Sequence, residues 1–238
     1  MPYIDTFKMT SGSVLYVVAT PIGNLDDMTL RALQVLHQVD LVATEDTRHS
    51  GRLLHHFGIK TRLLSLHDHN ERQRSKFLLQ QLQNGLTVAL ISDAGTPLIA
   101  DPGFFLVREV RAAGYQVVPV VGACALVAAL SVAGLPTDRF TFNGFLASRS
   151  QARKQQLQHL CNQPITQIFY ESTHRIINCM EDLVAVCGPD RQVVLARELT
   201  KAFETVYDGV AAAVLHWLNQ DNNRQRGEFV VLMAGSDQ

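Results

Sequence analysis

Residues 87–103 read TVALISDAGTPLIADPG. The apolar run 87–91 predicts a buried strand, and the pattern after Gly103 predicts a helix over 104–113. The twelve residues 92–103 join them, whereas such connections usually take about 2–6 residues. An ordinary turn is the alternative, but this length favours a binding loop at the carboxyl end of a parallel strand, where Gly95 lets a ligand approach the backbone. Asp101 and Pro102 are expected to start the helix, as N-cap and first helical residue.

The same strand–loop–helix rhythm recurs through the first half of the chain. Strands are predicted at 14–19, 41–44, 62–66, 87–91 and 116–120, and helices at 29–38, 47–57, 70–84, 104–113 and 123–133. Asp27 and Asn70 are the expected helix caps, and Gly85 follows the end of a helix. This alternation predicts a mostly parallel sheet with helices on both faces.

Residues 134–138 read as a linker, after which strands and helices start again. Strands are predicted at 140–145, 165–170, 192–196, 203–207 and 229–234, and helices at 150–160, 174–186 and 210–218. We therefore expect an α/β protein with two α/β domains, residues 1–135 and 136–238. The first would have a mostly parallel sheet, the second a mixed sheet, and a ligand cleft would lie between them.

The composition narrows the class of protein. The chain has 238 residues, 47% of them hydrophobic, and a net charge of −1, so it is not a globally basic nucleic-acid binder. Four scattered cysteines without a CxxC pair indicate reduced thiols and a cytoplasmic protein. Residues 1–11 lack the apolar segment of a signal peptide. The apolar run 115–135 is interrupted by glycine and proline, so no membrane partner is expected.

Polar clusters follow several of the other predicted strands. The loop 19–27 is marked by glycine and proline but is not GxGxxG, which argues against a dinucleotide-binding fingerprint. Glu45 and Asp46 lie beside Arg48, and could bind or activate a ligand hydroxyl; alternatively, Asp46 or Thr47 simply caps the next helix. In the second half, similar clusters stand at 169–175, 196–201 and 226–229.

Histidines and basic residues allow two further interpretations. His67 and His69 could begin a metal site, but no third ligand follows at a recognised spacing, so no metal is expected. Basic residues gather in two stretches, either as solvated helix surface or as a phosphate-binding rim. They include Arg48, Arg52, Arg72 and Arg74 in the first half and Arg149, Arg153 and Lys154 in the second.

These loops, in this order, resemble the tetrapyrrole methylase superfamily, and within it the family of bacterial 16S rRNA (cytidine-2′-O)-methyltransferases. The matching stretches are residues 17–25, 45–48, 92–103, 170–175, 196–201 and 227–228. The chain departs from the superfamily at Val121-Gly122, where Pro-Gly is frequent. Members of the rRNA family also usually continue beyond the last strand into a small extension, whereas this chain ends at Gln238.

The resemblance implies methyl transfer from S-adenosylmethionine to the ribose 2′-hydroxyl of a cytidine in 16S rRNA. The substrate would be rRNA within the small ribosomal subunit, and the enzyme a homodimer. A methylase of small tetrapyrroles is the alternative, although the basic clusters favour RNA. A non-enzymatic RNA-binding or assembly factor is a third possibility, which the long loop 92–103 argues against because it suits a small cofactor.

The resemblance also assigns site residues. Cofactor-binding residues would be Pro21, Asp93, Ala94, Gly95, Thr96, Ile99, Ala123, Cys124, Phe145, Tyr170 and Glu228. A ribose hydroxyl is a poor nucleophile at neutral pH, so a general base is expected. Glu45 and Asp46 are the leading candidates for this catalytic role and Glu171 is the alternative, while Asp93 positions the cofactor. Substrate phosphates would be held by Arg48, Arg52, Arg72, Arg74 and Arg175.

Overall fold

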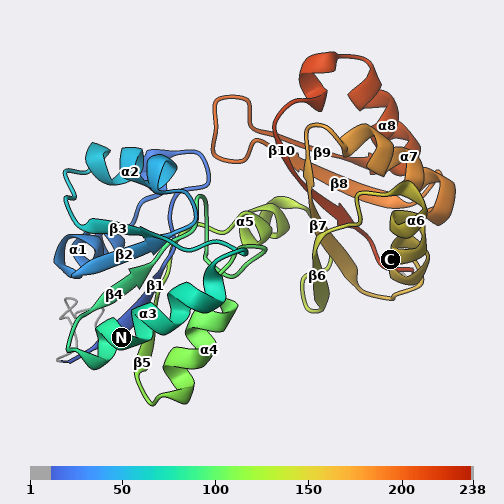
Figure 1. Ribbon diagram of the computed structural model, residues 1–238. Coiled ribbons are helices and arrows are strands. Elements are labelled where there is room, and N and C mark those ends of the chain that lie inside the picture. The colour runs from blue at the N-terminus through green and yellow to red at the C-terminus, as the bar shows by residue number, and fades with distance from the viewer. Residues whose placement is uncertain (1–11, 237–238) are drawn as a thin grey trace, which may run out of the picture. The chain divides into compact units, whose positions relative to one another are not determined.

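The computed structural model describes residues 12–236, and the chain divides into two compact units, Met1–Cys124 and Ala125–Gln238 (Figure 1). The helix α5 (Ala125–Val132) groups with the second unit, whereas the sequence pattern assigns it to the first. Within residues 12–236, no helix is long and apolar enough to cross a membrane. The expectation about a signal peptide concerns residues 1–11, which lie outside the described part of the chain.

The first unit contains a five-stranded sheet in the order β3-β2-β4-β1-β5, and all of its strand pairings are parallel. Its strands are β1 (Val14–Val18), β2 (Leu41–Thr44), β3 (Arg62–Ser65), β4 (Val88–Leu90) and β5 (Gln116–Val120). Its helices are α1 (Leu30–Gln38), α2 (Thr47–His56), α3 (Glu71–Gln83) and α4 (Phe104–Ala112), with a 3-10 turn at Leu25–Asp27. The predicted parallel α/β unit is confirmed.

Both faces of this sheet are covered by helices. Val14 and Tyr16 of β1 pack with α1 and α2 on one face, and Leu15 packs with α3 and α4 on the other. Successive side chains of a strand point to opposite faces, so the continuous apolar run of β1 is what a sheet covered on both sides requires.

The topology identifies where a ligand would bind. The helix that follows β1 covers one face of the sheet, while the helix that follows the neighbouring β4 covers the other. The two loops therefore leave the sheet edge in opposite directions, and such a switch point is the usual ligand crevice of open α/β sheets.

The second unit contains a mixed sheet in the order β6-β7-β10-β8-β9, as predicted. Its strands are β6 (Phe140–Phe145), β7 (Thr166–Ser172), β8 (Gln192–Arg197), β9 (Thr205–Val210) and β10 (Glu228–Met233). β6 and β7 are parallel, and the other pairings are antiparallel. Besides α5, the unit contains α6 (Ser150–Leu160), α7 (Ile176–Cys187), α8 (Ala211–Asn219) and a 3-10 turn at Asn222–Gln225.

The helices α6, α7 and α8 cover one face of the second sheet and enclose its core. Arg153 of α6 is only 2% exposed there, and its guanidinium bonds both to Asp182 of α7, at 2.6 Å, and to neighbouring carbonyl oxygens. The interpretation of Arg153 as part of a phosphate-binding rim is therefore wrong, because the side chain is buried and paired.

Three expected helix starts differ in the structure. Thr29, not Asp27, caps α1, accepting a hydrogen bond from the Ala32 amide. Asn70 stands at the N-cap of α3, but its side chain accepts from the His67 amide instead of capping the helix. α4 begins after Gly103 and not at Asp101-Pro102.

Glu71 of α3 takes the capping role at α4. Its carboxylate oxygen Oε1 accepts from the amides of Gly103, at 3.0 Å, and Phe105, at 2.8 Å. A buried carboxylate supplied by a neighbouring helix thus satisfies the donors that a local cap usually satisfies.

Candidate functional site

The loops after β1 and β4 are joined directly at the switch point. The amide of Thr20 donates to the Gly95 carbonyl at 2.9 Å, and the Gly95 amide donates back at 3.0 Å. Gly95 has φ +81°, and a Cβ there would lie 3.2 Å from Cγ2 of Ile22. Glycine is therefore required at this position both by its backbone conformation and by its close neighbour.

The loop after β5 joins the same site. The Thr96 hydroxyl donates to the Ala123 carbonyl at 3.0 Å, so the loop after β4 contacts the loop after β5. A Cβ at Gly122 would lie 2.9 Å from Cβ of Ala19, which explains why glycine remains here although Val121 replaces proline. The predicted cofactor residues of the first unit thus lie in three adjoining loops: Pro21, Asp93, Ala94, Gly95, Thr96, Ile99, Ala123 and Cys124.

The loop after β4 also has an unusual backbone. Leu98 and Ala100 both have positive φ, 72° and 66°, which side-chain-bearing residues rarely adopt. Strain of this kind persists only where the surrounding structure enforces it, and it clusters at ligand-binding sites.

Asp46 has a structural role at the loop after β2. Its carboxylate accepts from the Arg48 amide at 2.8 Å and caps α2, and this hydrogen bond is the main reason its pKa is lowered. Its own amide donates to the carboxylate of Asp93 at 3.1 Å, which ties the loop after β2 to the loop after β4. The capping interpretation of Asp46 is confirmed.

Glu45, by contrast, caps nothing and lies half-buried in an acidic surrounding. Burial raises its pKa, and the charges of Asp93 and Asp68 raise it further. Burial likewise raises the pKa of Asp101 to about 6, with smaller contributions from Glu45 and Asp93, although a hydrogen bond with Ser92 opposes the change. The carboxyl edge of the sheet therefore concentrates negative charge, which favours a cationic ligand.

Sequence reasoning missed Asp68 and Asp101 as members of this acidic edge. Both follow predicted strands, at 62–66 and 87–91, so their position after a strand was the available signal. Among the residues the structure describes, no group of three or more His, Cys, Asp and Glu side chains could hold a metal ion.

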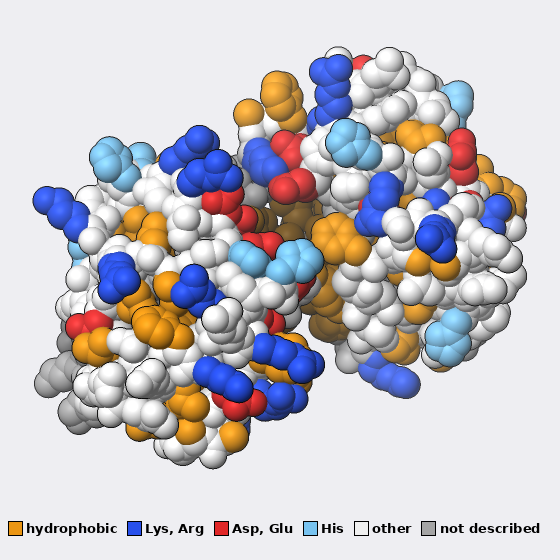
Figure 2. All heavy atoms as spheres, viewed as in Figure 1, with side chains coloured by type: hydrophobic (Ala, Val, Ile, Leu, Met, Phe, Trp, Pro, Cys, Tyr) orange, Lys and Arg blue, Asp and Glu red, His pale blue; other side chains and the backbone are white. Residues whose placement is uncertain are grey.

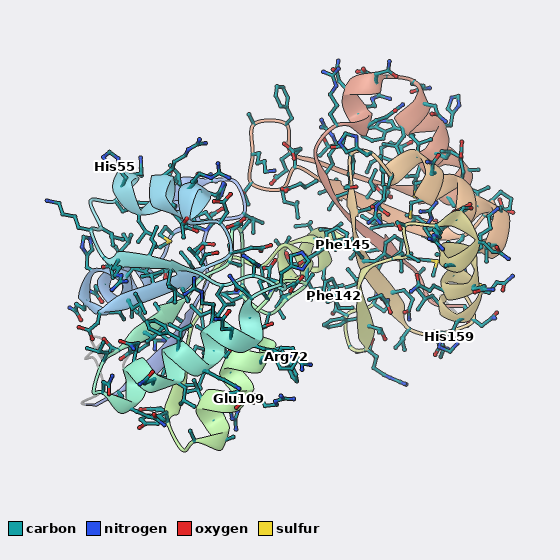
Figure 3. The ribbon with its side chains drawn as sticks, in the orientation of Figure 1. His55, Arg72, Glu109, Phe142, Phe145 and His159 are labelled. Atoms are coloured by element: carbon teal, nitrogen blue, oxygen red, sulfur yellow. The ribbon has the colours of Figure 1, made fainter. Side chains whose placement is uncertain are left out.

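In the second unit, an aromatic group forms around Tyr170. Its ring packs against Phe142 at 4.8 Å and Phe145 at 5.8 Å between centroids, and its hydroxyl oxygen accepts from the Leu126 amide at 3.0 Å. Figure 3 labels Phe142 and Phe145, which belong to β6. The structure thus brings the predicted cofactor residues Phe145 and Tyr170 together, with half of Phe145 exposed.

Glu171 and Arg175 pair with each other. Nε of Arg175 donates to Oε1 of Glu171 at 2.7 Å, its Nη2 lies 2.7 Å from the same oxygen, and the Ser172 amide donates there at 2.8 Å. The Glu171 carboxylate is fully buried: its Oε1 accepts from donors of its own unit, whereas its Oε2 has no hydrogen-bond partner among the described residues.

Glu228 belongs to a separate network with Lys201. The Lys201 ammonium lies 2.7 Å from Glu228 and 2.9 Å from Glu198. A Cβ at Gly227 would lie 2.4 Å from Cγ of Glu198, which explains the glycine at this position. The structure therefore brings the motifs 196–201 and 226–229 together.

The remaining predicted substrate residues lie on helix surfaces of the first unit. Arg48 and Arg52 are exposed one turn apart on α2, Arg72 is exposed at the start of α3, and Arg74 is half-buried. Only Arg175, in the second unit, is engaged with a buried carboxylate.

Comparisons with known proteins agree with this architecture. A family model for Tetrapyrrole (Corrin/Porphyrin) Methylases matches residues 14–215. The chain is 56% identical over 221 residues to ribosomal RNA small subunit methyltransferase I of Escherichia coli O157:H7, an alignment covering 93% of this chain and 77% of that protein. It is also 56% identical to the protein of the same name from Pseudomonas aeruginosa, with 94% and 80% covered.

Solved structures share the fold at lower identity. The crystal structure of uroporphyrin-III-C-methyltransferase from Thermus thermophilus superposes with a TM-score of 0.64 at 20% identity, covering 94% of this chain and 96% of that one. The family match, the high identity and the shared fold lead to one conclusion: the chain belongs to the tetrapyrrole methylase family, within the group of ribosomal RNA small subunit methyltransferase I proteins.

Proposed function

We propose that this protein transfers the methyl group of S-adenosylmethionine to rRNA of the small ribosomal subunit. The 56% identity to a small-subunit rRNA methyltransferase over 93% of the chain carries this proposal. The acceptor implied by the sequence resemblance is the ribose 2′-hydroxyl of a cytidine in 16S rRNA. The tetrapyrrole alternative has behind it the broad family model and the fold of a solved structure at 20% identity.

The loops of the first unit fit the cofactor by their chemistry. S-adenosylmethionine supplies, when bound, a methyl group on a positively charged sulfur. The carboxylates of Glu45, Asp93 and Asp101 favour such a cation, and Gly95 leaves the backbone open to close approach. Pro21, Ala94, Thr96, Ile99, Ala123 and Cys124 would line this crevice. The sequence resemblance also assigns Phe145, Tyr170 and Glu228, which belong to the second unit, to the cofactor.

Glu45 is the general base of the proposal. Its raised pKa makes its ionised carboxylate a stronger proton acceptor than an ordinary glutamate, and no capping role occupies it. Asp46 is engaged as a helix cap, and Glu171 is held by Arg175 inside its own unit. Glu45 would take the proton of the ribose hydroxyl, while Arg48, Arg52, Arg72 and Arg74 hold substrate phosphates.

Transfer of labelled methyl from S-adenosylmethionine tests the proposal. Small-subunit particles and free small-subunit rRNA are offered in parallel, and the modified nucleotide is mapped. We expect labelling of one ribose, and the preferred substrate identifies the assembly stage. Absence of S-adenosylmethionine binding by calorimetry contradicts the methylase function, and label on a base atom contradicts the ribose assignment. The homodimer and the cytoplasmic location stay predictions from the sequence.

A further inference from the structure

An exposed cluster of aromatic and arginine side chains begins where the loop 92–103 ends. Phe104, the first residue of α4, is 59% exposed, and its ring meets that of Phe105 edge-on at 5.5 Å. The guanidinium of Arg108 lies 5.4 Å from the Phe104 ring and 5.0 Å from the Phe105 ring. Arg72 of α3 lies 4.6 Å from the Phe105 ring. We call these four residues the platform.

The platform carries positive charge that its surroundings do not neutralise. Across residues 12–236, no carboxylate lies within ion-pair distance of Arg72, and Arg108 has only the half-exposed Glu109, at 3.5 Å. Figure 2 shows basic side chains beside hydrophobic ones over α3 and α4, and Figure 3 labels Arg72 and Glu109 on these helices. Exposed phenylalanine beside two arginines, of which only Arg108 has an ion-pair partner, suits a partner that is both flat and anionic.

The platform is also held in a fixed position. Glu71, one residue before Arg72, accepts from the amides of Gly103 and Phe105, and α3 packs along α4. The same two amides flank Phe104, so its backbone is fixed at the end of the proposed cofactor loop. A rigid aromatic surface binds with less loss of conformational freedom than a mobile one.

We propose that an unpaired nucleotide of the rRNA substrate stacks on Phe104, while Arg72 and Arg108 contact the adjacent phosphates. The assignment rests on the proposed rRNA methyltransferase function and adds the substrate surface. Unpaired bases stack on aromatic rings and on arginine planes, whereas paired bases do not present a free face. The single strand is therefore the form of RNA that this surface selects.

Methyl-transfer kinetics test the contribution of the platform to the substrate. Phe104→Ala and Arg108→Gln should each raise the KM for small-subunit rRNA about tenfold, with kcat and S-adenosylmethionine affinity unchanged. Leu30→Ala, an exposed apolar residue of α1, and Arg139→Gln, an exposed arginine of the second unit, are matched controls that should leave KM unchanged. Unchanged KM in both platform variants overturns the proposal.

A fluorescence experiment tests the stacking itself and does not depend on methyl transfer. In Phe104→Trp, emission is measured against a wild-type background that contains only Trp217. A short oligouridylate should quench the added emission, and the same strand annealed to oligoadenylate should not. Equal quenching by both forms, or by neither, overturns the platform.

Two outcomes distinguish a failure of the proposed methyltransferase function from a failure of the nucleotide-stacking proposal. If the wild-type protein labels no rRNA while the oligouridylate still quenches Phe104→Trp, the proposed function fails and the platform stands as an RNA-binding surface. If Phe104→Ala abolishes self-association in sedimentation, the surface is an interface between two copies of the chain, and the nucleotide proposal is overturned.

Discussion

At the scale of single residues, the two adjacent carboxylates after β2 have different roles. Asp46 bonds the backbone of its own helix, whereas the pKa of Glu45 is raised by burial and, to a smaller extent, by neighbouring carboxylates. The environment therefore separates a structural residue from a candidate base, although the sequence places them side by side.

Glu45→Gln should lower the single-turnover methyl-transfer rate by about 10²–10⁴-fold, because glutamine cannot accept the proton. The wild-type rate should fall as pH drops through the raised pKa of Glu45, so the acid limb should lie above 4.5. This limb should vanish in Glu45→Gln, while calorimetric affinity for S-adenosylmethionine stays within about threefold.

Asp46→Asn distinguishes the two carboxylates. Asparagine caps helices about as well as aspartate, so we expect less than a threefold loss of rate, on the order of experimental scatter between variants. A large loss in Asp46→Asn together with a normal rate in Glu45→Gln contradicts the assignment and identifies Asp46 as the base.

The raised pKa of Asp101 can be tested through the pH dependence of the free energy of unfolding. Its folded-state pKa is raised from 3.8 to about 6, so its contribution to stability is fully present below 3.8 and is lost as pH rises through 6. Each pKa unit corresponds to about 1.4 kcal/mol, and screening by solvent around this half-buried group reduces the total to about 1–2 kcal/mol.

Asp101→Asn should therefore increase the free energy of unfolding at pH 7 by about 1 kcal/mol and change it little at pH 4. Urea unfolding at the two pH values measures this difference. A variant that is destabilised equally at both values shows that the Ser92 hydrogen bond, and not the burial of the charged carboxylate, dominates at Asp101.

At the scale of elements, the start of α4 depends on a carboxylate from another helix. Glu71→Ala leaves the amides of Gly103 and Phe105 without their acceptor, and should cost about 3 kcal/mol of unfolding free energy. Glu71→Gln keeps an oxygen acceptor and should cost about 1 kcal/mol. Urea unfolding and amide exchange at Phe105 measure both effects.

Glu109→Ala, which removes a half-exposed carboxylate of α4, is the control and should stay within about 0.5 kcal/mol of the wild type. Faster exchange at Phe105 in Glu109→Ala than in Glu71→Ala contradicts the capping role of Glu71.

Sequence patterns predict the helices and strands better than they predict the side-chain contacts between elements, such as helix caps and buried ion pairs. Apolar runs and their spacing predict the parallel sheet, the mixed sheet and the binding loop, because burial follows from local periodicity. The expected cap of α4 was wrong because Asp101-Pro102 is a good local signal, whereas the carboxylate that takes the capping role, Glu71, comes from 32 residues earlier in the chain than Gly103. Arg153 was misread for the same reason, since its partner Asp182 lies on another helix.

At the scale of the whole molecule, each unit has a core of its own. Tyr16 of β1 packs in a cluster drawn entirely from the first unit, and Val231 of β10 in one drawn entirely from the second. Two separate cores predict that damage to one unit leaves the protection of the other intact.

Arg153→Met tests this independence. It leaves Asp182 buried without its main partner, which should cost the second unit about 3–5 kcal/mol. Amide exchange should accelerate at Val231 and its neighbours in β10, while exchange at Tyr16 stays at its wild-type rate. If the amide exchange rate increases equally in β10 and in β1, the two units unfold together, because the protection of one unit then depends on the other. Arg149→Met, which replaces an exposed arginine next to the same helix, should leave amide exchange unchanged in both strands. Faster exchange in that variant would mean that the loss of surface charge, and not the loss of the buried pair, is responsible.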